Sequence, residues 1–104
     1  MYKILIVEDD VVISEEVSKH LTKWGYEVSR IHDFTQVLEE FKKVEPHLVL
    51  MDIGLPFYNG YYWCTEIRKS SKVPIIFLSS ASDSMNIVMA MNMGADDLLL
   101  SPLN

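Results

Sequence analysis

Carboxylates follow two apolar runs of this sequence directly. The run Ile4–Val7 leads into the acidic tripeptide Glu8–Asp10, and the run Leu48–Met51 leads into Asp52. A carboxylate at the end of a buried run costs burial energy unless it is paired or has a function. Carboxylates that lie together also repel one another and resist ionisation unless a cation lies among them. Mg²⁺ fits such a group, because it binds oxygen ligands and keeps positions for water and phosphate.

Simpler interpretations exist for each of these residues. The acidic tripeptide alone is equally typical of a solvated turn in which Asp10 caps a helix. Asp52 argues against that interpretation, because a strand normally continues or turns through Gly or Asn at such a point. Ser79 and Ser80 follow another apolar run and are either turn residues or hydroxyl donors to a phosphoryl oxygen.

Five short segments have the composition of strands that would position these side chains. Most are rich in β-branched and aliphatic residues, which is typical of strands buried on both faces. They are residues 3–7, 26–31, 48–52, 74–79 and 97–101. The second segment is the most polar, which favours a place at the sheet edge. The fifth is the weakest strand signal, because Leu98–Leu100 suits a helix equally well.

Helix signals separate the predicted strands. Asp10 is the expected N-cap of a first helix, and Gly25 stands where a left-handed C-cap is wanted. Asp33 and Gln36 form an aspartate version of the capping box for a second helix. The apolar stripe of the first helix consists of Ile13, Val17, Leu21 and Trp24, and that of the second of Phe34, Val37, Leu38 and Phe41.

Two further helices complete a strict alternation of strand and helix. Asn59–Gly60 opens a third helix that runs through Ile67, and Ser82 opens a fourth that ends at Gly94. Such alternation predicts a doubly wound α/β fold with a parallel sheet covered by helices on both faces. Ligands of these sheets bind beyond the carboxyl ends of the strands. The acidic residues and Ser79 are therefore expected at one edge.

Composition excludes several classes of function. The chain has 104 residues, with nine Lys and Arg against fifteen Asp and Glu, a formal net charge of −6. This balance argues against a basic face that wraps nucleic acid. Cys64 is the single cysteine, so a disulfide framework is excluded and a reducing compartment is favoured. With neither a signal peptide nor an apolar run of about 20 residues, we expect a cytoplasmic protein without a membrane partner.

Four segments of the sequence, in this order, resemble the receiver domain of two-component response regulators. They are Ile4–Asp10, Leu48–Pro56 with Gly60, Pro74–Ser79, and Gly94–Asp97. The resemblance covers essentially the whole chain. It implies a flavodoxin-like fold with five parallel strands in the order 2-1-3-4-5. It also implies a signalling switch that is not itself an enzyme.

The resemblance assigns roles to individual residues. Asp52 corresponds to the phosphoacceptor, which takes a phosphoryl group from a sensor histidine kinase. Glu8 and Asp9 correspond to the acidic pair that holds Mg²⁺ together with Asp52 and the main-chain carbonyl of Gly54. Ser79 stands where the family places its switch hydroxyl. DNA would be contacted only through an output domain outside this chain. A second copy of the chain, forming a homodimer, is a further possible partner.

The end of the chain departs from the family pattern. Ser101 stands where the family carries a lysine that pairs with the phosphoryl group, and Leu98 where an aromatic switch residue is common. The family's fifth helix has no counterpart before Asn104. The sequence therefore predicts one receiver domain over residues 1–104 that is incomplete at its C-terminus. The bond before Pro102 is expected to be cis, as is usual in the family.

Two other functions compete with the active receiver. A pseudo-receiver would keep the fold as an interaction module without switching, and the missing lysine at Ser101 favours it. A haloacid-dehalogenase type phosphatase also uses a nucleophilic aspartate and Mg²⁺. That class requires a second aspartate two positions after the nucleophile, where this chain has Gly54. The active receiver is favoured over the pseudo-receiver because its acidic residues and switch hydroxyl are all present, namely Glu8, Asp9, Asp52 and Ser79. We therefore rank the active receiver first.

Overall fold

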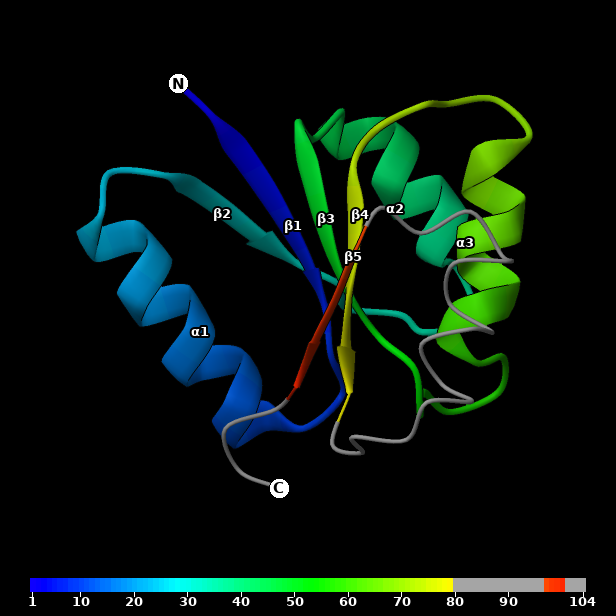
Figure 1. Ribbon diagram of the computed structural model, residues 1–104, viewed down its shortest axis with the longest axis horizontal. Coiled ribbons are helices and arrows are strands. Elements are labelled where there is room, and N and C mark those ends of the chain that lie inside the picture. Colours follow the sequence, from blue (N-terminus) through cyan, green and yellow to red (C-terminus); the bar gives the residue numbers. More distant parts are fainter. Residues whose placement is uncertain (80–96, 101–104) are drawn as a thin grey trace.

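Five parallel strands form one sheet in the order β2-β1-β3-β4-β5 (Figure 1). The computed structural model describes residues 1–79 and 97–100. The strands are β1 (Lys3–Val7), β2 (Glu27–Arg30), β3 (Leu48–Asp52), β4 (Ile75–Ser79) and β5 (Asp97–Leu100). The predicted flavodoxin-like α/β fold is therefore confirmed, and the polar strand β2 lies at the sheet edge, as its composition indicates.

Three described helices cover the sheet. They are α1 (Val11–Lys23), α2 (Val37–Val44) and α3 (Gly60–Arg68). Helix α1 lies on one side of the sheet, and α2 and α3 lie on the other (Figure 1). The predicted fourth helix, Ser82 to Gly94, and the Ser101–Pro102 bond lie outside the described residues. Within residues 1–79 and 97–100, every helix is too short or too polar to cross a membrane.

Two of the predicted helix caps are confirmed. The carboxylate of Asp10 accepts hydrogen bonds from the amides of Val12 and Ile13, at 3.0 and 3.2 Å. The side chain of Asn59 accepts from the amide of Tyr62 at 2.9 Å. These side chains satisfy amides that have no partner within the helix. Both helices therefore begin next to the carboxyl edge of the sheet.

The prediction for the start of α2 was wrong. The helix begins at Val37, and Gln36 makes no side-chain capping bond. The carboxylate of Asp33 instead accepts from the amide and hydroxyl of Thr35, at 2.9 and 2.6 Å, and closes a local turn. Asp side chains compete with helices in this way. Glu40 reaches back from within α2 and accepts the amide of Asp33 at 2.8 Å, so the turn is fixed from both sides.

Trp24 also departs from its predicted place on the apolar stripe of α1. Its side chain is 79% exposed. The helix ends at Lys23, and Trp24 is the C-cap, followed by Gly25 at a φ of +93°. A residue at the end of a helix no longer follows the helical periodicity, so the spacing that places Leu21 against the sheet does not extend to Trp24.

The core consists of two clusters separated by the sheet. The cluster beneath α2 and α3 is the larger, and its buried members include Leu5, Val7, Val49, Met51, Ile75 and Phe77. The cluster beneath α1 contains Ile4, Ile6 and Leu50. Successive strand residues alternate between the faces, as pleated backbone requires. Burial on both faces makes the middle strands a rigid support for whatever follows them.

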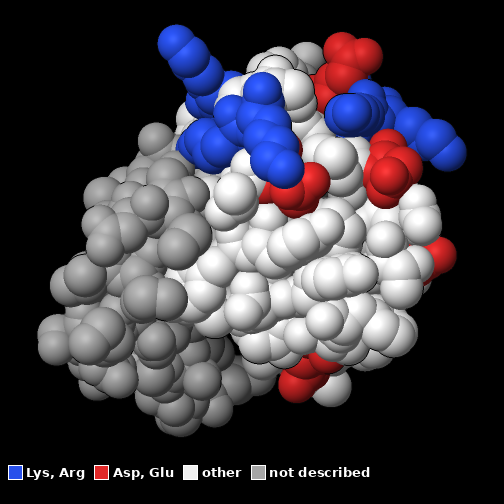
Figure 2. Space-filling view, turned by 90° about the vertical axis from the view of Figure 1, so that its right-hand side faces the viewer, with Lys and Arg blue, Asp and Glu red and all other residues white. Residues whose placement is uncertain are grey.

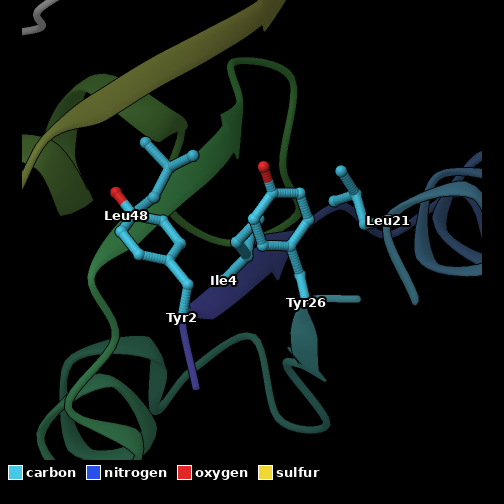
Figure 3. A pocket seen from close by; sticks show the side chains of 5 residues that line it. All are labelled: Tyr2, Ile4, Leu21, Tyr26 and Leu48. Atoms are coloured by element: carbon cyan, nitrogen blue, oxygen red, sulfur yellow. The ribbon is translucent and has the colours of Figure 1, made fainter. Parts of the chain in front are cut away.

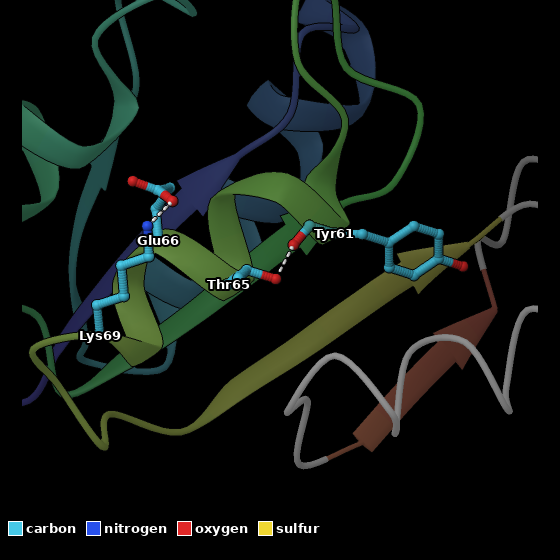
Figure 4. A network of polar contacts seen from close by, with 4 residues as sticks. All are labelled: Tyr61, Thr65, Glu66 and Lys69. Carbon is cyan, nitrogen blue, oxygen red and sulfur yellow. Dashed lines mark hydrogen bonds and ion pairs between the residues drawn. The ribbon is translucent and has the colours of Figure 1, made fainter.

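Helix α3 is anchored to the sheet by aromatic packing. Tyr61 packs edge-to-face against Phe77 of β4, with ring centroids 5.3 Å apart, and reaches across that strand (Figure 4). The hydroxyl of Thr65 donates to the carbonyl of Tyr61 at 3.0 Å, and Lys69 pairs with Glu66 at 2.7 Å. Cys64 of α3 is buried.

Candidate metal site at the carboxyl edge of the sheet

The register of the sheet brings the predicted carboxylates together. Val7 of β1 pairs with Met51 of β3, so Glu8 and Asp52 are the next residues on two neighbouring strands. Glu8, Asp9 and Asp52 each offer a carboxylate oxygen, and these oxygens lie within 4.8 Å of one another. Two segments more than 40 residues apart in sequence thus supply one group of hard oxygen ligands.

Burial and mutual repulsion both act on this group. Glu8 is half-buried, and its burial together with the neighbouring charges of Asp52 and Asp9 raises its pKa to about 7, although the amide of Asp10 donates to it at 3.1 Å. Burial also raises the pKa of Asp52, and the charge of Asp9 adds to that rise. Glu8 and Asp52 therefore hold a proton more tightly than isolated carboxylates do, and a bound cation would offset the burial and repulsion that cause this.

Backbone donors hold Asp52 in position. The amides of Gly54 and Ile53 both donate to its carboxylate. The loop then folds back, because the amides of Leu55 and Gly60 both donate to the carbonyl of Ile53, at 3.0 and 2.9 Å. The turn that follows Asp52 thus holds its carboxylate in place.

Gly60 has a role that the sequence did not reveal. A Cβ built on Gly60 would overlap the main-chain carbonyl of Asp52 and touch the ring of Phe77. Only glycine allows α3 to begin this close to the end of β3. One feature of the sequence could have indicated this close approach. Gly60 occupies the first helical position, directly after the Asn59 cap, where a residue with higher helix propensity is usual.

The remaining predicted site residues are placed only by their backbone. Leu78 of β4 pairs with Asp52, so Ser79 lies one residue farther along the neighbouring strand, at the same edge. Ser80 lies outside the described residues. Gly54 lies in the turn that donates to Asp52. The hydroxyl of Ser79 and the carbonyl of Gly54 keep their roles as predictions.

The donor set fits Mg²⁺. It consists of oxygen atoms only, and nitrogen or sulfur ligands that would favour a transition metal do not belong to it. Three ligand oxygens leave further positions for water and for a phosphoryl group. A divalent charge would also offset the repulsion that raises the pKa of Glu8. Glu8, Asp9 and Asp52 are therefore suitable ligands for Mg²⁺.

Basic side chains gather at the opposite end of the molecule. Lys and Arg cluster at one end of the face formed by α2 and α3 (Figure 2). They include Lys42 and Lys43 in the last turn of α2 and Arg68 in the last turn of α3. Cations at helix C-termini interact favourably with the helix dipole. Arg68 also donates to the carbonyl of Val73 at 2.7 Å. These residues have a structural explanation and lie away from the carboxylates.

A pocket of about 430 Å³ lies at the amino ends of β1, β2 and β3. Tyr2 and Tyr26 stand over it with their rings edge-to-face, 5.8 Å apart (Figure 3). The other lining residues are Ile4, Leu21 and Leu48. Its walls carry no carboxylate and no imidazole, and it is at the edge opposite Asp52. The pocket is therefore separate from the candidate metal site.

The sequence of this chain matches the response regulator receiver domain family over residues 4–104. The chain belongs to this family. It is 45% identical over 104 residues to the sensory transduction protein BceR of Bacillus subtilis, covering 100% of this chain and 45% of BceR. It is also 46% identical to the uncharacterized transcriptional regulatory protein YvcP of the same organism, covering 100% of this chain and 44% of YvcP. The receiver domain thus spans less than half the length of these relatives.

Solved structures agree with this assignment. The N-terminal domain of the nisin resistance regulator NsrR, a lantibiotic response regulator, superposes with a TM-score of 0.89 at 46% identity, covering 100% of this receiver domain and 88% of that chain. The resemblance given by the motifs around Asp52 is therefore confirmed. The acidic group of the structure lies where those motifs place it on the sheet edge.

Proposed function

We propose that this receiver domain is switched by phosphorylation of Asp52. The observation that carries the proposal is the group of three carboxylates formed by Glu8, Asp9 and Asp52 at the carboxyl edge of a parallel sheet. Such a group serves neither packing nor stability without a cation, because like charges at this separation repel one another. A bound cation beside a nucleophilic carboxylate suits phosphoryl transfer, which depends on positioning and charge stabilisation.

In the proposed reaction, a carboxylate oxygen of Asp52 attacks the phosphorus of a phosphorylated histidine. A new O–P bond forms and the P–N bond to the imidazole breaks, with its electron pair left on the nitrogen. The amides of Ile53 and Gly54 hold the carboxylate in one orientation. Glu8, Asp9, Asp52 and the carbonyl of Gly54 would hold Mg²⁺, which neutralises charge on the transferring group. The Ser79 hydroxyl would donate to a phosphoryl oxygen afterwards.

The partners follow from the same proposal. The phosphodonor is a sensor histidine kinase, and the response is passed to an output domain that binds DNA. The name of YvcP, a transcriptional regulatory protein of which this chain matches 44%, supports regulation of transcription. The net charge of −6 supports an output that contacts DNA through another segment. Location in the cytoplasm and a homodimer remain predictions of the sequence.

Phosphorylation is tested with acetyl phosphate and Mg²⁺, followed by intact-protein mass spectrometry. We expect one added phosphoryl group that hydroxylamine removes, as an acyl phosphate requires. Asp52→Asn should abolish the addition. Asp10→Asn is the matched control, because it removes a charge from the same acidic tripeptide but keeps the helix cap and lies outside the metal group.

A pseudo-receiver is the second candidate, favoured by Ser101 at the position of the family's lysine. The same experiment separates the two functions. If the parent chain takes up no phosphoryl group under conditions that label another receiver domain, the interaction module is the better description. A phosphoryl group that survives in Asp52→Asn would instead place the acceptor elsewhere.

A further inference from the structure

Three exposed aromatic side chains follow Asp52, on the loop before α3 and in its first turn. Phe57, Tyr58 and Tyr62 are 76%, 48% and 41% exposed. We call them the aromatic ridge. Phe57 has a φ of +67°, in the left-handed region, where a bulky side chain is strained. Exposure of these aromatic rings and strain at Phe57 both cost free energy within the chain itself.

The ridge is preorganised. The rings of Tyr58 and Tyr62 stack, with centroids 4.4 Å apart and an interplanar angle of 20°. Both pack edge-on against the buried Trp63, at 5.7 and 4.9 Å. The amide of Tyr58 donates to the carbonyl of Pro56 at 2.8 Å. Aromatic side chains held in this way lose little entropy when a partner covers them.

The ridge is also close to Asp52. Gly60 lies against the carbonyl of Asp52, and Tyr58 and Tyr62 are each two residues from Gly60. Their Cα atoms are therefore within about 8 Å of the Gly60 Cα. A protein that delivers a phosphoryl group must bring its reacting atom to about 3.5 Å from the Asp52 carboxylate. A protein donor that binds there buries roughly 800 Å² of this chain's surface around Asp52. A small phosphodonor covers only the carboxylates.

We propose that the aromatic ridge is a docking surface for the phosphohistidine-bearing protein and that it selects this donor without taking part in the chemistry. This inference rests on the proposed function of Asp52. The partner presents apolar side chains to the ridge. It presents basic side chains to Glu8, Asp9 and Asp10, because complementary charge guides association at an acidic edge.

The test compares a protein donor with a small one. Cytoplasmic fragments of a panel of purified histidine kinases are autophosphorylated with ATP, and the fastest donor to the parent chain is used. Phe57→Gly relieves the positive φ, and Tyr62→Gln keeps a good helix former in α3. Each variant should lower kcat/KM for transfer from the kinase by about tenfold. Labelling by acetyl phosphate is measured on the same preparations as the reference.

Trp24→Ser is the matched control. Trp24 is 79% exposed and Phe57 is 76% exposed, so the two side chains are similarly accessible. Trp24, however, lies at the C-terminus of α1, near the amino ends of the strands and away from Asp52. It should leave transfer from the kinase unchanged. The docking proposal is overturned if the ridge variants lose the same factor with both donors, if they lose nothing with the kinase, or if only acetyl phosphate labels the parent. Failure of both donors to label the parent would instead contradict the proposed function of Asp52.

Discussion

Gly60 lies so close to Asp52 that a Cβ on the glycine would overlap the main-chain carbonyl of the aspartate. The contact joins the first residue of α3 to the last residue of β3. This contact brings together the two residues that flank the loop 53–59. It therefore fixes the position of the loop relative to the carboxylate of Asp52. Since Asp52 ends β3 whereas Glu8 and Asp9 follow β1, displacement of the Asp52 backbone would move its carboxylate relative to the other two.

Gly60→Ala should therefore destabilise the chain although alanine is the better helix former. Overlap with backbone is relieved only by shifting β3 or α3, which costs about 1–3 kcal/mol. The urea midpoint of unfolding should fall, with an unchanged m-value. Gly54→Ala is the control, because a Cβ there meets nothing within 4 Å and the midpoint should hardly move. Equal midpoints for the two variants would mean that the close approach is absent in solution.

Millimolar Mg²⁺ should raise the unfolding temperature of the parent chain. A ligand that binds only the native state stabilises it by mass action. Asp9→Asn and Asp52→Asn each remove a carboxylate from the group, and both should lose the response to Mg²⁺. Asp10→Asn should keep it. Scanning calorimetry with and without Mg²⁺ measures the effect, and an undiminished response in both ligand variants would place the metal elsewhere.

Stability in the absence of metal should depend on the protonation of Glu8. Its pKa rises from 4.5 to about 7 in the folded chain, chiefly through burial. The folded state therefore binds the proton more tightly than the unfolded state between these values. The free energy of unfolding should fall as the pH rises from about 4.5 to about 7, and this contribution should be constant above that range. Glu8→Gln should flatten this part of the profile.

The histidines also titrate in this range, so the difference between the parent and Glu8→Gln is the measured quantity. Mg²⁺ competes with the proton, and its stabilising effect on the parent should be larger at pH 8 than at pH 5.5. Denaturant unfolding in the presence of a chelator gives the metal-free profile. Parallel profiles for parent and variant would show that Glu8 is not the group that responds.

Replacement of Glu45 by glycine should stabilise the folded chain. It is the C-cap of α2 and has a φ of +51°, which is unfavourable for a residue with a side chain. Its carboxylate also lies at the negative end of the helix dipole. Glu45→Gly should raise the free energy of unfolding by about 1 kcal/mol. Glu45→Val should lower it, since a β-branched residue tolerates this conformation worst; a gain in stability with valine would refute the explanation.

The sequence by itself determined the strands, their parallel arrangement and the chemistry at their carboxyl ends, while their order was implied by the resemblance to receiver domains. Apolar runs such as Ile4–Val7 are typical of strands buried on both faces of a sheet, and the carboxylates that follow such strands lie at its carboxyl end. The caps at Asp10 and Asn59 were equally local, because a side chain two or three residues away satisfies the free amides. Local patterns of this kind do not depend on the rest of the fold.

Only the tertiary structure decided how close these residues come and what surrounds them. The pairing of Val7 with Met51 sets Glu8 beside Asp52, and the resulting burial raises the pKa of Glu8. Helix α2 begins at Val37 without the predicted capping box, and Glu40 within the helix accepts the amide of Asp33 from the turn before it. The overlap that requires glycine at position 60 arises where a helix meets a strand. Each of these features depends on atoms that packing brings together from segments distant in sequence. The distance between such atoms cannot be read from the spacing of residues along the chain.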